Sequence, residues 1–459
     1  MDGVDLVAER DTPLHGAAVD QLVRAIDGEA PYARSQAQLL PLQIAALDER
    51  FQKRRAQIKV LDQRARDVGV DRITRLADIV PLLFSHQTYK SYPESFLTRG
   101  QWDRMTKWLG TLMTKDCSGL DMAGVEDVDG WEQRLAAAGF PLRASSGTTG
   151  KASFLPWSQA DIEWHRRLNL AALAFQGLPP EHRYICISMG NASGPHRPVD
   201  RSRVLAQGYA KPGQIYNLFE RRASIVEINR LGALRKAMVD GTIAPADLIT
   251  YETNVAQRTA ETEAGVQRLI RVIKGAGDTP IMIHGGWAAM LQLVQAARAA
   301  GVADGSLPAG SVYEIGGGPK GAQLPDDYEQ QVHGFFAGAR YMSLYGMSEI
   351  NQPTACCSCA RRHIPSSLVP ILLDETGEQV LDYAHGATGR LGLFDLSMEG
   401  RWGGVITSDL VRIETDPCDC GLHGLRLEFI GRYSDQAGGD DKLTCAGTMA
   451  AYIRGAIDP

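Results

Sequence analysis

Seven residues in the first third of the chain carry an unusual density of polar groups: Ser145-Ser146-Gly147-Thr148-Thr149-Gly150-Lys151. Four hydroxyl groups, two glycines and one lysine supply side-chain donors, closely approachable backbone N–H groups and a positive charge, which together suit a polyphosphate. The stretch is not a Walker A motif, because only two residues separate Gly147 from Gly150 and Ala152 follows the lysine. A polar surface turn is the alternative interpretation. We expect a phosphate-binding loop.

The sequence on either side of this loop predicts an α/β protein with four regions. Residues 1–140 are mainly helical, since Ile44, Leu47, Phe51, Ile58 and Leu61 share one helix face, and the opposite Arg-, Lys- and Gln-rich face should be solvated. Residues 141–367 alternate expected strands (184–189, 280–283, 311–315, 340–344) with helices, which predicts a largely parallel core. Residues 368–433 form a β-rich lobe with strands at 369–373, 391–396, 404–413 and 425–433. Residues 434–459 are predicted to be a hinge and a C-terminal remnant.

Composition narrows the possible partners. The 459 residues include 48 Lys plus Arg and 54 Asp plus Glu, which gives a net charge of −6. This negative charge does not favour binding to nucleic acid. No apolar run approaches the roughly 18 residues that span a bilayer, and the N-terminal residues carry acids and no apolar stretch of the kind found in signal peptides. We expect a cytoplasmic enzyme with no nucleic-acid partner and no membrane span.

Two glycine-containing motifs follow predicted strands. Gly316, Gly317 and Gly318 begin a formal G-x-G-x-x-G match, but Pro319 lies in the turn and no acid follows at the ribose-binding distance, so a dinucleotide fold is rejected. The triple glycine indicates either the close approach of a planar group or a tight turn. The second motif could stack a base, contact an acyl phosphate and hold Mg²⁺ through its glutamate, or could be a solvated turn: Tyr345-Gly346-Met347-Ser348-Glu349.

An isolated acid and a group of cysteines complete the candidate residues. Asp409 lies among apolar strand residues, so it either binds a ligand hydroxyl or faces solvent. Five of the eight cysteines cluster, and two Cys-x-Cys pairs can supply four thiolates to tetrahedral zinc, with His363 as the alternative fourth ligand: Cys357, Cys359, Cys418, Cys420. Buried free thiols are the other interpretation.

In this order the motifs resemble those of the adenylate-forming superfamily, which includes acyl-CoA synthetases and nonribosomal peptide adenylation domains. The resemblance covers roughly residues 80–445 and implies a large N-terminal lobe of mixed, mostly parallel sheets flanked by helices, with a smaller β-rich lobe. It implies that residues 145–151 bind phosphates through Lys151, that Gly316–Gly318 and Tyr345 position adenine, and that Ser348 and Glu349 are catalytic, Glu349 holding Mg²⁺. Asp409 would bind ribose, and Arg432 would lead into the hinge.

Within the superfamily, residues 85–93 resemble acyl-protein synthetases of bacterial luciferase operons, and the cysteine pattern resembles phenylacetate-CoA ligases, some of which hold zinc. The implied reaction is ATP-dependent activation of a small-molecule carboxylate substrate to an acyl-adenylate, followed by transfer to CoA, a carrier-protein thiol or an amine. The implied cofactors are ATP, Mg²⁺, structural Zn²⁺ and possibly CoA.

Two features depart from the family pattern. Ser348 replaces the commoner threonine and keeps the hydroxyl. The family's C-terminal lid with its catalytic lysine has no counterpart here, since Lys442 lies in the hinge-like stretch, so we expect the lid to be missing. The alternatives are an acyl-protein synthetase that carries the acyl group on Cys445, or a catalytically silent nucleotide- or acyl-binding protein.

Overall fold

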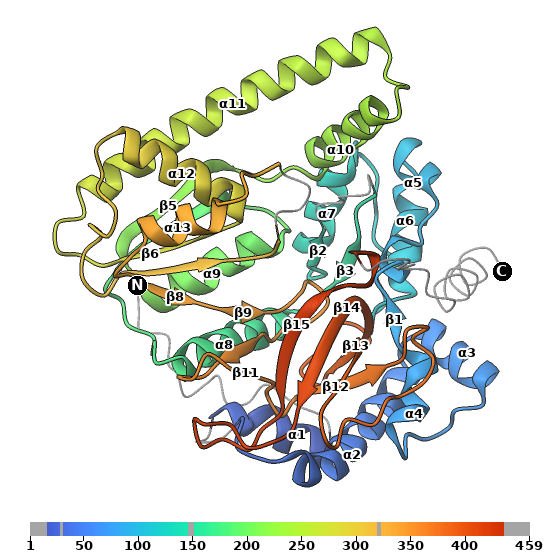
Figure 1. Ribbon diagram of the computed structural model, residues 1–459. Helices are drawn as coiled ribbons and strands as arrows, with labels where there is room; N and C mark the ends of the chain where they lie inside the picture. The colour runs from blue at the N-terminus through green and yellow to red at the C-terminus, as the bar shows by residue number, and fades with distance from the viewer. Residues whose placement is uncertain (1–15, 28–30, 146–150, 319–322, 436–459) are drawn as a thin grey trace.

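The computed structural model describes residues 16–27, 31–145, 151–318 and 323–435 (Figure 1). A five-stranded parallel sheet and an eight-stranded, mainly antiparallel sheet form its framework, and a two-stranded hairpin precedes the parallel sheet in the chain. This mixed architecture with flanking helices confirms the predicted fold class. Within the described residues, no helix is both long and apolar enough to cross a bilayer.

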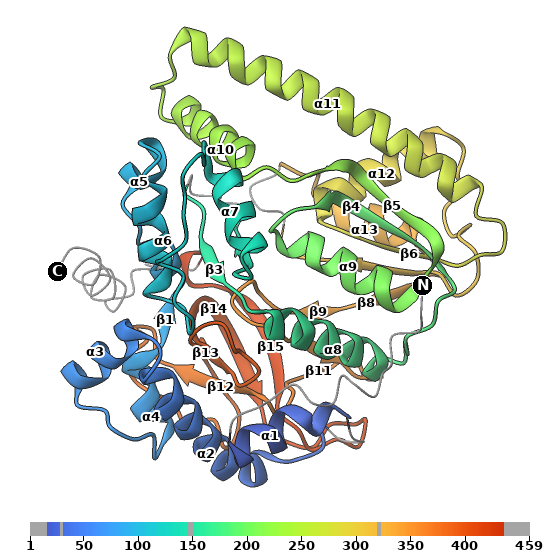
Figure 2. The ribbon, with the colours of Figure 1, turned by 180° about the vertical axis from the view of Figure 1, so that it is seen from behind.

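The parallel sheet has the strand order β5-β4-β6-β7-β8. Its strands are β4 (Tyr184–Ser193), β5 (Ala210–Arg222), β6 (Ile281–Gly285), β7 (Val312–Ile315) and β8 (Arg340–Met342). One face packs against α8 (Gln159–Phe175) and α9 (Arg197–Tyr209), as Figure 2 shows. The other face packs against α11 (Pro245–Lys274), α12 (Trp287–Ala299) and α13 (Tyr328–Phe335).

Alternation along the strands explains the two helical layers. In β4, Ile185 and Ile187 pack with α11 to α13, whereas Tyr184 and Cys186 pack with α8 and α9. Strands buried on both faces are apolar throughout, which is why the parallel sheet was predictable from short apolar runs. Strand β5 was not predicted, because it begins Ala-Lys-Pro-Gly and much of it is exposed.

The second sheet has the order β12-β13-β14-β15-β11-β10-β9, with β1 (Phe84–Ser85) added parallel to β14. Its other strands are β9 (Leu344–Tyr345), β10 (Thr354–Cys356), β11 (Arg362–His363), β12 (Leu368–Leu373), β13 (Ala387–Asp395), β14 (Gly404–Glu414) and β15 (Arg426–Arg432). Only Ser343 separates β8 from β9, so the chain passes directly from the parallel sheet into this one.

The N-terminal part is helical, with α1 (Ala17–Val23), α2 (Gln36–Arg55), α3 (Lys59–Val68), α4 (Leu76–Ile79), α5 (Glu94–Thr98), α6 (Trp102–Gly110) and α7 (Val128–Ala137). Short 3-10 turns are η2 (Arg24–Asp27), η3 (Val80–Leu82), η4 (Thr88–Lys90) and η5 (Tyr433–Asp435), and the hairpin comprises β2 (Leu142–Ala144) and β3 (Phe154–Pro156).

The predicted helix face over residues 44–61 is divided between α2 and α3. Ile58 is extended and precedes α3, although it is as fully buried as Leu47 and Phe51.

The prediction that the basic face of α2 is solvated is wrong. Arg50 and Arg54 are buried, and their guanidinium groups lie 2.6 and 2.7 Å from the carboxylate of Glu399. Arg50 also donates to the carbonyl of Leu396 at 2.9 Å. A buried charge requires a partner, and this one comes from the connection between β13 and β14, far along the chain.

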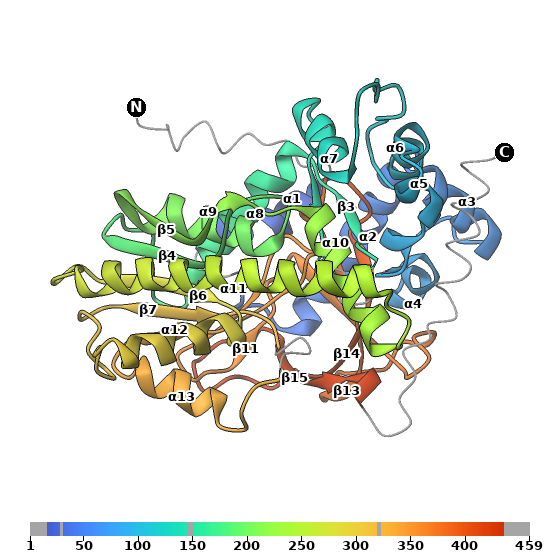
Figure 3. The same ribbon diagram turned by 90° about the horizontal axis from the view of Figure 1, so that it is seen from above.

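One pair of helices projects beyond the parallel sheet, although the end of α11 packs against that sheet. Helix α10 (Ile225–Val239) leads into the 30-residue α11, and Figures 1 and 3 show α11 as a long rod along one side of the molecule.

Candidate active site

The carboxyl ends of β6, β7 and β8 bring two of the predicted motifs to one edge of the parallel sheet. β7 ends at Ile315, immediately before Gly316, and β8 leads through β9 to Tyr345 and Gly346. Gly316 donates its N–H to the carbonyl of Gly285, the last residue of β6, at 2.9 Å. In open α/β sheets, ligands bind at this edge.

The triple glycine presents bare backbone at the edge. A Cβ atom added to Gly316 or Gly318 would meet no heavy atom of the described residues within 4 Å, and Gly317 has φ +72°. Packing therefore does not require glycine at Gly316 or Gly318. The space beside these two residues can accept a flat group. Only Gly317 has a backbone reason for being glycine.

Tyr345, Asp409 and Arg432 come together from three strands. The Tyr345 hydroxyl donates to the Asp409 carboxylate at 2.6 Å, and the Arg432 guanidinium lies 3.7 Å from the other oxygen of that carboxylate. Asp409 is opposite Arg432 in the β14–β15 ladder and is 9% exposed. Its carboxylate is therefore largely buried next to Tyr345 and Arg432. Burial raises the pKa of Tyr345 well above its usual value, and the adjacent Asp409 adds to this, so the phenol remains a donor.

Three arginines hold the backbone of the segment that carries Ser348 and Glu349. Arg197, the first residue of α9, donates to the carbonyl of Gly346. Arg401 donates to the carbonyls of Glu349 at 2.8 Å and Ser348 at 3.3 Å, and Arg143 approaches the Ser348 carbonyl at 3.4 Å.

Arg143 and Arg401 are almost completely buried. Burial lowers the pKa of Arg143 to about 10, while Asp200, 2.7 Å away, acts in the opposite direction. Because these cations bind the carbonyl groups, they hold the backbone from which the half-buried side chains of Ser348 and Glu349 extend.

The predicted phosphate loop lies in the hairpin between β2 and β3. Ser145 and Ser153 close its base, since Ser145 donates its N–H to the Ser153 carbonyl at 3.0 Å and Ser153 donates its own to the Ser145 hydroxyl at 2.8 Å. Five of the predicted loop residues lie outside the described residues: Ser146, Gly147, Thr148, Thr149 and Gly150.

Lys151 is held at the end of this loop. Its ammonium group donates to the Tyr92 carbonyl and lies 4.3 Å from the centre of the Tyr92 ring. Burial lowers the pKa of Lys151, with Glu94 opposing and Lys90 adding to the shift. Burial also lowers the pKa of Lys90, and the negative charge of Glu349 opposes it. Lys90 therefore interacts electrostatically with both Lys151 and Glu349.

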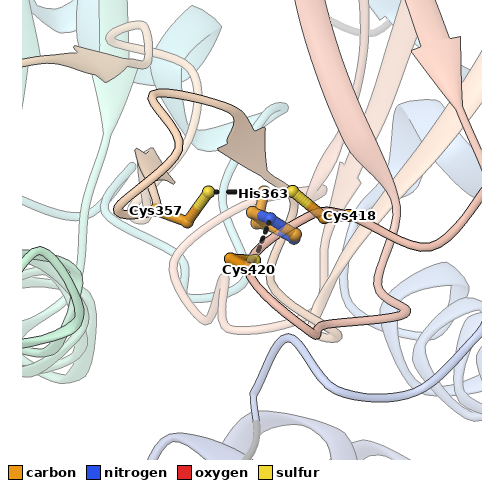
Figure 4. Close-up of side chains that lie close together, drawn as sticks. All are labelled: Cys357, His363, Cys418 and Cys420. Carbon is orange, nitrogen blue, oxygen red and sulfur yellow. Dashed lines mark hydrogen bonds between the residues drawn. The ribbon is translucent and has the colours of Figure 1, made fainter.

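A second cluster lies where β10, β11 and the β14–β15 connection meet. The ligand atoms of Cys357, His363, Cys418 and Cys420 all lie within 4.8 Å of one another, and Figure 4 shows the four side chains turned toward a common centre. The Cys357 and Cys418 sulfurs are 3.8 Å apart, and the Cys420 sulfur is 3.6 Å from Nε2 of His363. Tetrahedral zinc bonded to sulfur at about 2.3 Å and nitrogen at about 2.0 Å requires ligand separations of roughly 3.5–3.8 Å.

The hairpin between β10 and β11 explains why Cys359 is outside this cluster. Cys356 pairs with Arg362, so residues 357–361 form the connecting loop, and Ala360 adopts φ +56° there. Cys357 lies at the base of the loop and Cys359 at its exposed tip. His363, the alternative ligand in the sequence interpretation, occupies the fourth place instead.

Several contributors had no sequence signal. Arg143, Arg197 and Arg401 stand in unrelated segments, and only the folded chain brings them to Gly346, Ser348 and Glu349. Lys90 belongs to the segment that suggested the luciferase-operon resemblance, but nothing in its spacing assigned it a role. Cys445 lies outside the described residues, as does most of the predicted hinge and remnant at 434–459.

Comparison with known proteins identifies the fold. No family profile matches the chain, and no curated protein matches it in sequence. Solved structures of 2-hydroxyisobutyryl-CoA ligase are similar in fold. The open conformation with 2-HIB-AMP and CoA gives a TM-score of 0.52 at 12% identity over 91% of this chain and 80% of that chain. The postadenylation state with 2-HIB-AMP gives 0.53 at 12% identity over 93% and 74%. The chain therefore has the fold of the adenylate-forming enzymes.

Proposed function

We propose that this protein activates a carboxylate with ATP to form an acyl-adenylate and pyrophosphate. The observation that carries the proposal is the arrangement of Tyr345, Asp409, Lys151 and Glu349, which come from three segments of the chain on an adenylate-forming fold. The paired Tyr345 and Asp409 suit a nucleoside, and Lys151 with Lys90 supplies positive charge for phosphates.

In the proposed reaction, a carboxylate oxygen attacks the α-phosphorus of ATP and the bond to pyrophosphate breaks. Lys151 and the hydroxyl-rich loop stabilise the charge on the departing pyrophosphate. Tyr345 and the bare backbone of Gly316–Gly318 orient adenine, and Asp409 accepts hydrogen bonds from ribose. Glu349 would hold Mg²⁺, which supplies charge neutralisation on the phosphate oxygens when bound.

The test is carboxylate-dependent exchange of labelled pyrophosphate into ATP, using aliphatic, hydroxylated and aromatic acids. Exchange with at least one acid is expected, and it should require Mg²⁺. ATP binding without exchange for any acid would favour the silent binding protein instead.

We further propose CoA as the acyl acceptor, because the similar solved structures include complexes with acyl-AMP and CoA. Thioester formation would be measured with CoA, a pantetheine-bearing carrier protein and an amine. An acyl label that survives denaturation and requires Cys445 would instead identify an acyl-protein synthetase.

We propose that Cys357, His363, Cys418 and Cys420 bind one structural zinc ion. The support is the fit of the 3.8 and 3.6 Å ligand separations to tetrahedral geometry. A site with four protein ligands has no open position for substrate, so its role would be to join the β10–β11 hairpin to the β14–β15 connection.

A further inference from the structure

The helical pair of α10 and the first part of α11, residues 225–264, has no core of its own. We refer to it as the α10–α11 hairpin. Ile225 is buried, but among residues 226–264 with described side chains none is buried, and core contacts resume only at Gly265 and Val266. A helix in water gains most of its stability from packing an apolar face, so about 20 residues of α11 lack their usual support.

Apolar side chains concentrate on this hairpin. Of the eight exposed large hydrophobic residues in the described part of the chain, four belong to it: Val226 (37%), Met238 (42%), Ile249 (66%) and Val255 (41%). Scattered exposed apolar residues are ordinary, whereas a concentration on one projecting element marks an interaction surface.

The charges divide between the two helices. Helix α10 carries the exposed Arg230, Arg235 and Lys236, with no acid between Ile228 and Val239. The start of α11 carries the exposed Asp247 and Glu252, with no base before Arg258. Within the described residues, the ion pairs of the hairpin lie at its base, where Arg221 and Arg258 contact Glu227, and the five charged residues nearer the tip form none.

We propose that this protein forms a twofold dimer in which two α10–α11 hairpins pack as an antiparallel four-helix bundle. The surface is self-complementary, because a twofold axis brings the basic α10 of one copy against the acidic α11 of the other, twice. The exposed apolar residues then become the interior of the bundle. An anionic membrane would instead favour basic charge on both helices.

Charge exchange between copies gives a direct test. One variant carries Arg230→Glu, Arg235→Glu and Lys236→Glu, so both its helices are acidic; the other carries Asp247→Lys and Glu252→Lys, so both are basic. Sedimentation velocity of the full chain at concentrations up to about 100 µM should show a dimer for the native protein and monomers for each variant alone. An equimolar mixture should restore the dimer, because each helix again faces the opposite charge.

The apolar contribution is tested separately. Ile249→Glu combined with Val255→Glu should weaken the dimer by about a hundredfold or more. The control is Ile215→Glu, at a similarly exposed position (49%) on β5, which should leave the dimer unchanged. Circular dichroism at high dilution checks that all variants fold. A native protein that is monomeric throughout, a mixture that stays monomeric, or a dimer that survives the apolar substitutions would each overturn the proposal.

Discussion

Lys151 and Glu349 come to the proposed phosphate site from two separate segments, Lys151 from the connection between β2 and β3 and Glu349 from the residues after β9. Each would act on charge that develops as pyrophosphate leaves, so we expect Lys151→Ala and Glu349→Ala to reduce pyrophosphate exchange by more than about tenfold. The exposed Lys107 and Glu126 provide matched controls, and their alanine variants should retain native exchange. Native activity in both site variants would contradict the proposed mechanism.

Arg401 is expected to matter for stability as well as for the site. Arg401→Met would leave the Pro156 and Glu349 carbonyls without donors at 2.6 and 2.8 Å, so we predict a loss of about 3 kcal/mol or more in the free energy of unfolding. Urea denaturation measures it, and Arg412→Met, at an exposed position on β14, should change stability by less than about 0.5 kcal/mol. A native urea midpoint for Arg401→Met would show that these carbonyls find other partners.

At the scale of elements, the two cysteine-bearing turns provide a prediction with an internal control. The purified protein should contain about one zinc per chain, and Cys357→Ser or Cys418→Ser should abolish binding because each removes a converging ligand. Cys359→Ser, two residues from Cys357, should retain the metal because its side chain lies at the exposed loop tip. Metal analysis of each variant, prepared without chelators, measures the zinc content per chain. Equal loss from the Cys359 and Cys357 variants would show that the hairpin adopts another conformation around zinc.

The elements that could be predicted from sequence are those with local causes. Strands β4, β6 and β7 are short apolar runs, so each was located to within a few residues. Strand β5 was missed because half of it serves as an exposed sheet edge, and the break before α3 was missed because Ile58 is buried whether or not it is helical.

In the candidate site, too, the residues with a local sequence signal could be predicted and those placed by long-range contacts could not. Tyr345, Asp409 and the cysteines could be predicted as site residues, because each is a residue type that is unusual in its sequence context. Arg143, Arg197 and Arg401 do not, because an arginine that binds a distant carbonyl looks in sequence like any surface arginine. The long-range contacts that bury it are set by the whole fold.

Across the whole molecule, buried histidines make stability depend on pH. Burial lowers the pKa of His284 to about 4, with Glu314 opposing and Arg201 adding to the shift. The unfolded chain binds this proton near pH 6.5, so the stabilisation is complete above that value and is lost as pH falls toward 4, by up to about 3 kcal/mol.

Urea midpoints at pH 7 and pH 5 measure the effect. His284→Gln should reduce the difference between the two midpoints, whereas His385→Gln, at an exposed position, should leave it as in the native protein. An unchanged difference in the His284 variant would assign the pH dependence to other groups, including the buried His165 and His196.

The ion pairs of Arg50 and Arg54 with Glu399 have a consequence for synthesis on the ribosome. The partners of these arginines are made about 345 residues later. At roughly 5–20 residues per second, the nascent α2 waits on the order of 20 s to a minute with two cations and an apolar face exposed. The first helices of this protein are therefore expected to be natural clients of chaperones that bind emerging chains, until the β-rich lobe is translated and closes over them.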